Sequence, residues 1–340
     1  GVALIRTGEL TGERPPVDEA IGAFRKALTE LTFERGAAAW AETQNNLGAA
    51  LSWLGNKTED IDFYRQSVEA YRAAQKVQTF EAMPVAWALS QYNVGTTTGM
   101  IGRVTRDVAT LKESVAAHTN ALKVYSRAQM PREWMRTHYE LGRTLFSLAR
   151  LTDDRAIAQQ AIAAFEESLR DVTPEIARHQ WGTSHKYMAE IHMGFAGTDQ
   201  SAKEARKAIA AYKAVFQGAN IEKYWGDMIE AHSSLAQAYL RLGLIEGNAD
   251  AMRQARAEYE KAMALTNRAA DPEGWVNTKD GLAGVVAELG ILTRNGNDIA
   301  EARRIVAEVW DFVRENGVDK YDTYFRDRLA VIDRHLSDVR

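Results

Sequence analysis

A period of 47 residues runs through the chain and constrains its fold more than any other feature. Tryptophan recurs at positions 40, 87, 134, 181 and 275, which are separated by whole multiples of 47, and the remaining multiple falls at Met228. Seven residues after these positions comes a large apolar residue followed by a small one: Leu47-Gly48, Val94-Gly95, Leu141-Gly142, Met188-Ala189, Leu235-Ala236 and Leu282-Ala283. Such a fixed period predicts a stack of similar structural units.

The second half of each unit repeats as well. A small residue recurs at one phase, and four residues later the chain carries an aromatic residue in most units: Phe24, Tyr71, His118, Phe165, Tyr212 and Tyr259. In both halves the apolar and small residues are spaced i, i+3, i+4 and i+7, which is the spacing of one helical face. Each unit is therefore predicted to form two helices of roughly 20 residues, after two short turns are subtracted.

Proline and glycine mark the expected helix ends. Pro84, Pro131 and Pro272 each precede a repeat tryptophan by three residues, where proline suits a first helical turn. Glycine recurs at positions 8, 55, 102, 243 and 290, near the end of the first helix, whereas positions 149 and 196 carry alanine. A left-handed helix cap would explain the glycine, and close helix packing would explain it equally well.

A single helix pair cannot bury its apolar face, so neighbouring pairs must stack. The expected fold is all-α, an α-solenoid of stacked antiparallel helix pairs with about 14–15 helices. We expect one domain over residues 1–340, made of a partial first repeat (1–35), six repeats (36–318) and a C-terminal capping helix (319–340). Because Gly1–Leu4 aligns with Gly48–Leu51, we expect a fragment of a larger protein; a true N-terminus with a shortened helix is the alternative.

The repeat resembles the tetratricopeptide repeat. Leu47-Gly48 with Leu51, followed by Ser67, Tyr71 and Ala74, is similar to that family's pattern L-G-x-x-Y and A-x-x-x-F-x-x-A. The unit of 47 residues is longer than the usual 34, as in a long variant common in bacterial multidomain proteins. The resemblance implies a right-handed superhelix that binds protein partners on its concave side, often next to a signalling, protease-like or nucleotide-binding domain.

Composition excludes several other classes of protein. The net charge is −4, with 46% hydrophobic and 26% charged residues, which argues against disorder and against a dedicated nucleic-acid binder. The absence of cysteine excludes thiolate metal sites and a cysteine nucleophile. No segment approaches the roughly 20 apolar residues of a membrane helix, and no signal peptide is visible, so we expect no membrane partner and a cytoplasmic location.

Catalytic and metal-binding patterns are weak. His138, His185 and His232 share one phase, but stacked helices lie about 8–10 Å apart, too far to share one metal ion. A structural role is expected for them, with a pH-sensitive role as the alternative. The chain has no phosphate-binding loop, no H-E-x-x-H motif and no nucleophile triad, so no enzyme activity, cofactor or metal site is expected. The repeat tryptophans are expected in the core, and Trp53, which is off the repeat phase, partly exposed.

The family's ligand-facing phases can be carried over because the Leu-Gly pair fixes the register. They fall on the first helix of each unit, and in the middle units they bring Arg136, Arg143 and Lys186 beside aromatic residues. This combination suits a peptide or helix that bears acidic groups. The candidate partner-binding residues on the concave face are Tyr92, Arg136, Tyr139, Arg143, Phe146, Lys186, Glu190, Met193, Gln237 and Arg241. The alternative is a solvated face paired internally through Glu140 and Glu190.

The function expected from these observations is a protein-interaction scaffold that binds a peptide or partner protein. A ligand-sensing domain that regulates an attached signalling or effector enzyme is the alternative. Self-association through the terminal helices is a third possibility. The ordinary acidic net charge of −4 gives no reason to expect nucleic acid as a partner.

Overall fold

Each repeat unit folds as two helices joined by a tight turn. The computed structural model describes residues 1–218, 225–316 and 321–339, and these residues form helices and short connections without any strand. The helices are α1 (Val2–Thr11), α2 (Pro15–Glu30), α3 (Phe33–Thr58), α4 (Ile61–Ala74), α5 (Pro84–Thr105), α6 (Val108–Ala121), α7 (Pro131–Thr152), α8 (Arg155–Ser168), α9 (Arg178–Asp199), α10 (Ala202–Gly218), α11 (Trp225–Glu246), α12 (Ala249–Leu265), α13 (Pro272–Thr293), α14 (Gly296–Glu315) and α15 (Asp322–Asp338).

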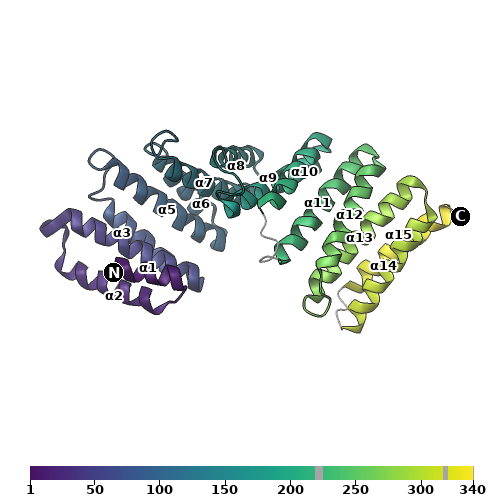
Figure 1. Cartoon of the computed structure of the whole chain (residues 1–340), viewed down its shortest axis with the longest axis horizontal. Helices are drawn as coiled ribbons and strands as arrows, with labels where there is room; N and C mark the ends of the chain where they lie inside the picture. Colours follow the sequence, from purple (N-terminus) through teal and green to yellow (C-terminus); the bar gives the residue numbers. More distant parts are fainter. Residues whose placement is uncertain (219–224, 317–320, 340) are drawn as a thin grey trace. The chain divides into compact units, whose positions relative to one another are not determined.

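The helices stack in pairs inside two compact units, residues 1–172 and 173–340. Within each unit, a helix packs against its partner in the pair and against the neighbouring pair, as in α3–α4–α5 and α11–α12–α13 (Figure 1). First helices of consecutive pairs also touch, for example α5 with α7. The all-α class and the paired helices predicted from the repeat are confirmed. The prediction of one continuous domain over residues 1–340 stays a prediction.

The two helices of a pair differ in length. First helices α5, α7, α9, α11 and α13 have 22 residues each, as the repeat predicted. Second helices α4, α6 and α8 have only 14 residues. In these pairs the rest of the repeat is a short turn segment that leads to the next first helix. Pro84, Pro131 and Pro272 lie in the first turns of α5, α7 and α13, which confirms their predicted role.

The turn inside each pair carries the left-handed residue, which lies four residues after the recurring glycine. The residues with positive φ recur every 47 positions: Gly12, Glu59, Arg106, Asp153, Gln200, Gly247 and Arg294. In five pairs the next residue, Asp or Asn, caps the second helix by accepting backbone N–H bonds, as Asp107 does from Ala109 and Thr110. Reading the recurring glycine as the left-handed cap is therefore wrong, because Gly102 accepts the cap bond through its carbonyl from inside the helix.

The recurring glycine instead permits close packing of the two helices in a pair. A Cβ on Gly55 would stand 2.8 Å from the ring of Tyr64, and one on Gly290 would stand 2.8 Å from Ile299. Such distances are too short for carbon atoms in van der Waals contact. Where the glycine phase carries alanine instead, the facing residue is also alanine, in the pairs Ala149 with Ala158 and Ala196 with Ala205. The second alternative, close helix packing, is correct.

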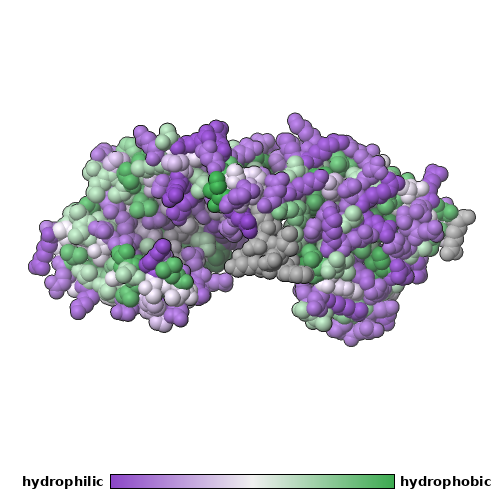
Figure 2. Space-filling view, viewed as in Figure 1, coloured by the Kyte–Doolittle hydropathy of each residue, from purple (hydrophilic) through white to green (hydrophobic). Residues whose placement is uncertain are grey.

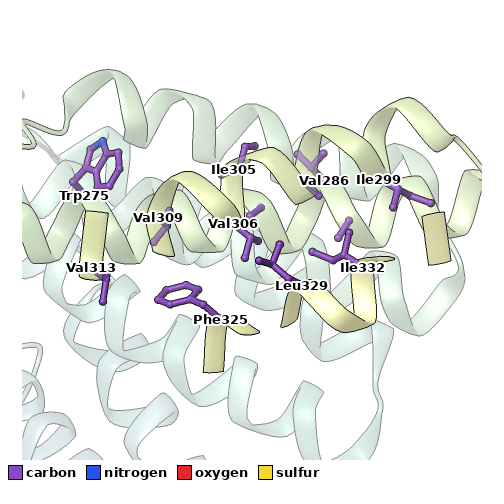
Figure 3. Packing of buried hydrophobic residues seen from close by; sticks show 13 residues of the cluster. Trp275, Val286, Ile299, Ile305, Val306, Val309, Val313, Phe325, Leu329 and Ile332 are labelled. Atoms are coloured by element: carbon purple, nitrogen blue, oxygen red, sulfur yellow. The ribbon is translucent and has the colours of Figure 1, made fainter. Parts of the chain in front are cut away.

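The apolar core of the second unit continues into the last helix. Trp275 and Val286 of α13 pack with Ile299, Ile305, Val306, Val309 and Val313 of α14, and these meet Phe325, Leu329 and Ile332 of α15 (Figure 3). Helix α15 therefore stands as the first helix of a further unit and covers α14. Its exposed residues include Arg326, Asp327 and Arg334, which gives it a charged outer face.

The repeat tryptophans are less buried than predicted. Trp275 is 6% exposed, but Trp40, Trp87, Trp134 and Trp181 are only half-buried. Trp275 differs because it packs against Phe312 of α14 and belongs to the buried core of the second unit. Trp87 packs edge-on against Phe80 with ring centroids 5.0 Å apart, and Phe80 is itself 44% exposed. Trp53 is half-buried beside the core of the first unit, in agreement with the prediction that it is partly exposed.

Candidate partner-binding surface

Two neighbouring first helices of the first unit present equivalent rows of side chains. Residues spaced by three or four along a helix share one face. On α5 one such row is Val85, Leu89, Tyr92, Thr96 and Met100, and on α7 the residues 47 positions later are Arg132, Arg136, Tyr139, Arg143 and Ser147. Because α5 and α7 touch, the two rows lie side by side. We call these ten residues the first-unit stripe.

The two rows meet where Arg136 of α7 covers Tyr92 of α5. The guanidinium carbon of Arg136 lies 5.3 Å from the centre of the Tyr92 ring, within the range of a cation–π contact. Tyr92 also packs edge-on against His118 of α6, with ring centroids 5.8 Å apart. Burial raises the pKa of Tyr92, and the charge of Arg136 partly opposes that shift. The predicted association of Tyr92 with Arg136 is therefore a contact in the structure.

Arg136 keeps its charge available because its side chain is exposed. Arg132, one helical turn earlier, is exposed as well. Within the described ranges, neither arginine forms an ion pair with a carboxylate. Tyr92 thus orients Arg136 without neutralising it, which leaves two cations at the start of α7 able to meet an acidic group.

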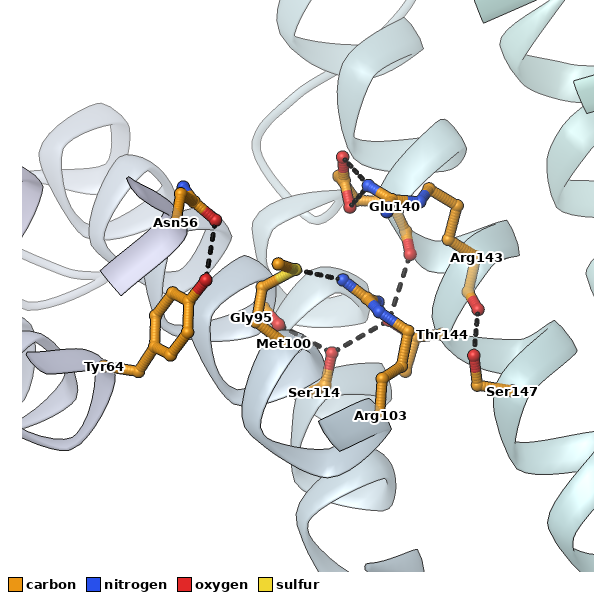
Figure 4. A network of polar contacts seen from close by, with 10 residues as sticks. All are labelled: Asn56, Tyr64, Gly95, Met100, Arg103, Ser114, Glu140, Arg143, Thr144 and Ser147. Atoms are coloured by element: carbon orange, nitrogen blue, oxygen red, sulfur yellow. Dashed lines mark hydrogen bonds and ion pairs between the residues drawn. The ribbon is translucent and has the colours of Figure 1, made fainter. Parts of the chain in front are cut away.

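Arg143 behaves differently because its charge is already compensated. Its guanidinium lies 3.1 Å from the carboxylate of Glu140, and only 26% and 12% of the two side chains are exposed. The same guanidinium lies 5.6 Å from the ring centre of Tyr139. Figure 4 shows this pair above a chain of buried hydroxyls, in which Ser114 bonds the Gly95 carbonyl and meets Thr144. Arg143 is therefore paired with Glu140 inside the protein, as the alternative of an internally paired face predicted for this residue.

Phe146 is the one member of the predicted set that the structure buries. Its side chain is 7% exposed, so it offers little surface to a partner. The reason is its phase, because Ser147 and not Phe146 continues the row of Arg132, Arg136, Tyr139 and Arg143. Phe146 is instead part of the buried core of the first unit, with Arg150 lying 5.6 Å from its ring centre.

The predicted residues of the second unit form a separate group on α9 and α11. Lys186 of α9 pairs with Glu230 of α11 at 2.7 Å. Burial would lower the pKa of Lys186, but the nearby charges of Glu230 and Glu190 outweigh it and raise the pKa. The expected partner, Glu190, therefore contributes at longer range than Glu230. Met193 is half-buried against the core, Gln237 is exposed and Arg241 is half-buried.

Four exposed apolar side chains near the start of α5 were missed by the sequence-based prediction. Phe80, Met83, Val85 and Leu89 are 44%, 39%, 50% and 46% exposed. Figure 2 shows hydrophobic atoms gathered over the part of the first unit where Figure 1 places α3 and α5. Leu89 has the repeat phase of Arg136, so extending the ligand-facing row by one turn toward the helix start would have found it.

Two of the three recurring histidines contact a tryptophan, and the third contacts a carboxylate. His138 packs edge-on against Trp134 and His185 packs at a tilt against Trp181, with ring centroids 4.6 and 4.5 Å apart, and burial lowers the pKa of both histidines. His232 contacts the carboxylate of Glu258 at 2.6 Å instead. Across the described parts of the chain, no three histidine or carboxylate side chains are grouped as they would be around a metal ion. None of the helices in those parts is long and apolar enough to cross a membrane.

Comparison with known proteins supports the repeat type. Residues 40–74 match the family described as tetratricopeptide repeat. No curated protein sequence matches the chain. Among solved structures, the apo form of RapI is 16% identical over 88% of this chain and 99% of its own, with a TM-score of 0.43. A Rap protein in complex with competence and sporulation factor is 11% identical over 98% of this chain and 84% of its own, with a TM-score of 0.42.

These two structures are distant similarities, so the repeat itself identifies the architecture. Its unit of 47 residues forms a long first helix, a tight turn and a second helix in both halves of the chain. The match to the tetratricopeptide repeat begins at the first repeat tryptophan, Trp40, and ends at Ala74, where α4 ends. The chain is a tetratricopeptide-like helical repeat protein.

Proposed function

We propose that the chain is a protein-interaction scaffold without catalytic activity, which binds a peptide segment of a partner protein on its first helices. In the first unit the binding surface is the first-unit stripe. In the second unit the candidates are Lys186, Glu190, Met193, Gln237 and Arg241 on α9 and α11. Stacked helix pairs suit this role because the framework residues hold the fold while the facing residues are free to differ.

One observation carries the proposal, namely the exposed Arg136 that Tyr92 holds in place. Fixing a long side chain before binding reduces the conformational entropy that binding must otherwise remove. Arginine and tyrosine are also the residue types enriched at the energetic centres of protein interfaces. The guanidinium carbon of Arg136 lies 5.3 Å from the centre of the Tyr92 ring, so this contact restricts the arginine side chain before a partner binds.

The charge of the stripe favours an acidic partner segment. Arg132 and Arg136 are exposed cations without a carboxylate partner among the residues whose positions are described, whereas Glu140 is occupied by Arg143. A carboxylate on the partner can accept two hydrogen bonds from one guanidinium. Complementary charge also raises the association rate, and this effect weakens with salt.

A selection from a random 16-residue peptide display library tests the proposal. The full chain is the bait, and the Arg132→Glu/Arg136→Glu variant is the comparison. Arg143 is left unchanged because a glutamate there would face Glu140 and disturb a half-buried pair. We expect enriched peptides rich in Asp and Glu that bind the variant at least tenfold more weakly.

A matched variant separates charge at the stripe from charge in general. Lys112 lies on the exposed side of α6, outside the stripe, so Lys112→Glu lowers the net charge without touching the stripe. Peptides selected on the wild type should bind Lys112→Glu within twofold of the wild type. Failure to enrich any peptide, or equal loss in both variants, would contradict a binding role for the stripe. The regulatory alternative stays a prediction from the sequence.

A further inference from the structure

We propose that one edge of the first unit docks a basic, proline-rich partner segment in the extended polyproline II conformation. This edge lies where the chain enters α3 and α5. The inference goes beyond the proposed function, because the edge is acidic and selects a partner of the opposite charge to that of the first-unit stripe. We call the surface the aromatic–acidic edge, and its six residues are Phe33, Glu34, Trp40, Phe80, Glu81 and Trp87.

The first argument is that two consecutive units present the same pair of rings. Phe33 contacts the repeat tryptophan Trp40 edge-on, with ring centroids 5.7 Å apart. Its equivalent 47 residues later, Phe80, contacts Trp87 in the same way at 5.0 Å. Phe33 is 46% and Phe80 is 44% exposed, and both tryptophans are half-buried. A partner therefore meets an accessible pair of aromatic rings in each unit.

The second argument is that the same turn holds both phenylalanines before a partner binds. The side-chain oxygen of Thr32 accepts the amide of Arg35 at 3.3 Å. In the next unit the side-chain oxygen of Thr79 accepts the amide of Ala82 at 3.2 Å. The carbonyls of both threonines accept a further amide four residues along the chain. A surface that is already ordered binds with a smaller loss of conformational entropy than a mobile one.

The aromatic–acidic edge is separate from the first-unit stripe. Trp87 lies two residues from both Val85 and Leu89 of the stripe, and two residues turn a helix by about 200°. Phe80 therefore contacts α5 on the side that faces away from the stripe. The next unit carries Arg127 at the phase of Phe80, so the repeated pair of rings is confined to α3 and α5.

The third argument is charge complementarity. Glu34 and Glu81 are exposed and directly follow the two phenylalanines. Neither carboxylate forms an ion pair with another residue in the parts of the chain that the structure describes. Hydrogen bonds from the backbone amide of Glu34 and from the Thr32 hydroxyl lower the pKa of the Glu34 carboxyl, which therefore stays charged. One carboxylate in each unit favours arginine or lysine on the partner.

The fourth argument is spacing. Helices α3 and α5 touch, and the axes of packed helices lie about 8–10 Å apart. Polyproline II advances about 9.3 Å in each turn of three residues, so one face of such a segment repeats at the same interval. Prolines three residues apart can therefore rest on consecutive pairs of rings, while cations three residues apart reach consecutive carboxylates. Aromatic surfaces are known receptors for this conformation.

The test measures fluorescence anisotropy of a labelled peptide of four Arg-Pro-Pro triplets with the full chain. This peptide should bind, and a peptide of four Arg-Gly-Gly triplets, which has the same charge but no proline, should bind at least tenfold more weakly. Phe80→Arg should weaken binding of the proline peptide at least tenfold. The fold should accept this change, because Arg268 has the phase of Phe80 and lies 4.5 Å from the ring centre of Trp275. Thermal unfolding followed by circular dichroism checks the fold.

Charge variants make the result specific. Glu81→Lys should weaken binding of the Arg-Pro-Pro peptide at least fivefold. Glu19→Lys is the matched control, because Glu19 is exposed near the start of α2, away from the edge, and it should change affinity less than twofold. Leu10→Arg is the control for the charge that Phe80→Arg adds, because Leu10 is 73% exposed outside the edge. It should also change affinity less than twofold.

Three results would overturn the inference. Absence of binding by the Arg-Pro-Pro peptide would remove the docking surface. Equal binding of the Arg-Gly-Gly peptide, or equal losses for Glu19→Lys and Glu81→Lys, would mean that general charge attraction explains the binding. A folded Phe80→Arg variant that binds like the wild type would show that the rings take no part. The proposed function is tested separately, by acidic peptides on the first-unit stripe, and would stand in each case.

Discussion

Gly55 of α3 and Tyr64 of α4 are packed so closely that a Cβ on Gly55 would stand 2.8 Å from Cδ1 and Cε1 of the tyrosine ring. The same two phases hold Ala149 with Ala158 and Ala196 with Ala205 in other pairs, where the facing residues are both small. Where the first position carries the larger alanine in place of glycine, the facing position carries the smaller alanine in place of a bulky residue. Together with Gly48 and Tyr71, whose would-be contact is also 2.8 Å, this contact permits the close approach of α3 and α4.

Gly55→Ala should lower the free energy of unfolding by about 1–3 kcal/mol, because the added methyl group overpacks the pair. In an open helix the same change stabilises by about 0.5–1 kcal/mol. Gly22 of α2, with nothing within 4 Å of its would-be Cβ, provides that control. Denaturant unfolding measures both variants, and stabilisation by Gly55→Ala would show that the close contact does not matter.

The double variant Gly55→Ala/Tyr64→Ala tests volume compensation directly. It recreates the alanine pair seen at Ala149 and Ala158. Its loss of stability should be smaller than the sum of the two single losses by about 1 kcal/mol or more, since neighbouring residues do not act additively. Strict additivity would contradict compensation between the two phases.

Replacing the left-handed residue of a pair by glycine should stabilise the chain. Arg106 has φ 55°, and Gly12 and Gly247 already occupy the same phase elsewhere. Relief of the left-handed strain by Arg106→Gly should raise the free energy of unfolding by about 0.5–1 kcal/mol. Lys112→Gly, inside helix α6, should lower it by about 1 kcal/mol. Equal losses in the two variants would show that the strain at Arg106 is negligible.

His118 should make the chain less stable in mild acid. It is fully buried, neither ring nitrogen has a hydrogen-bond partner among the described residues, and burial lowers its pKa from 6.5 to about 3. Between those two pH values the unfolded chain binds a proton that the folded chain does not, so stability falls as the pH drops. At pH 5 the loss from this group is about 2 kcal/mol relative to pH 8.

His118→Phe removes this dependence and is expected to fit, because Phe165 occupies the same phase against Gly142. The variant should be more stable than the wild type, by a margin that widens between pH 7 and pH 4.5. Urea unfolding at several pH values measures the margin. A margin that stays constant over this range would contradict a buried neutral histidine.

A buried carboxylate links α11 and α12. Glu258 is 7% exposed and contacts His232 at 2.6 Å and Lys261 at 2.7 Å. Burial alone would raise the pKa of Glu258, but His232 and Lys261 outweigh it, so the pKa is lowered from 4.5. The carboxylate therefore stabilises the fold above pH 4.5, and this contribution is lost as the pH falls through its lowered pKa.

Glu258→Gln should lower the free energy of unfolding by about 1–3 kcal/mol at pH 7, because His232 and Lys261 lose the buried carboxylate that they contact. Glu113, which pairs with Arg72 at an exposed site, is the matched control, and Glu113→Gln should cost less than about 1 kcal/mol. Chemical denaturation at pH 7 compares the two. Similar costs would mean that burial adds nothing to the pair at Glu258.

Periodicity predicted the helix pairs because framework phases repeat in residue type. Leu47 in the first full unit has equivalents in the other units that are all large and apolar, so the pattern is visible in the sequence. The left-handed phase repeats in conformation only, since Glu59, Arg106, Asp153 and Gln200 share no residue type. The turn sets the backbone geometry at this position whatever the side chain, so the recurring sequence signal is the Asp or Asn that follows it in five pairs.

The repeat predicted which helix positions of the candidate site face one another, but not how each side chain is placed. The contact of Arg136 with Tyr92 follows from two phases of adjacent first helices, which the repeat supplies. The prediction that Phe146 faces a partner was wrong, because Phe146 lies one residue before Ser147 and each residue along a helix turns the side chain by about 100°. Whether Arg143 faces a partner or Glu140 depends on side-chain conformation, which periodicity does not determine. Leu89 was missed because the predicted row on its helix began at Tyr92, one turn after Leu89.

Hydrogen–deuterium exchange, read by mass spectrometry with and without a selected acidic peptide, tests the central claim most directly. The claim is that a partner segment binds across the first helices α5 and α7. Slower exchange is predicted in fragments that cover residues 80–96 and 131–143, with no change in the second helices α4 and α8. Protection confined to second helices, with residues 80–96 and 131–143 unchanged, would contradict the account.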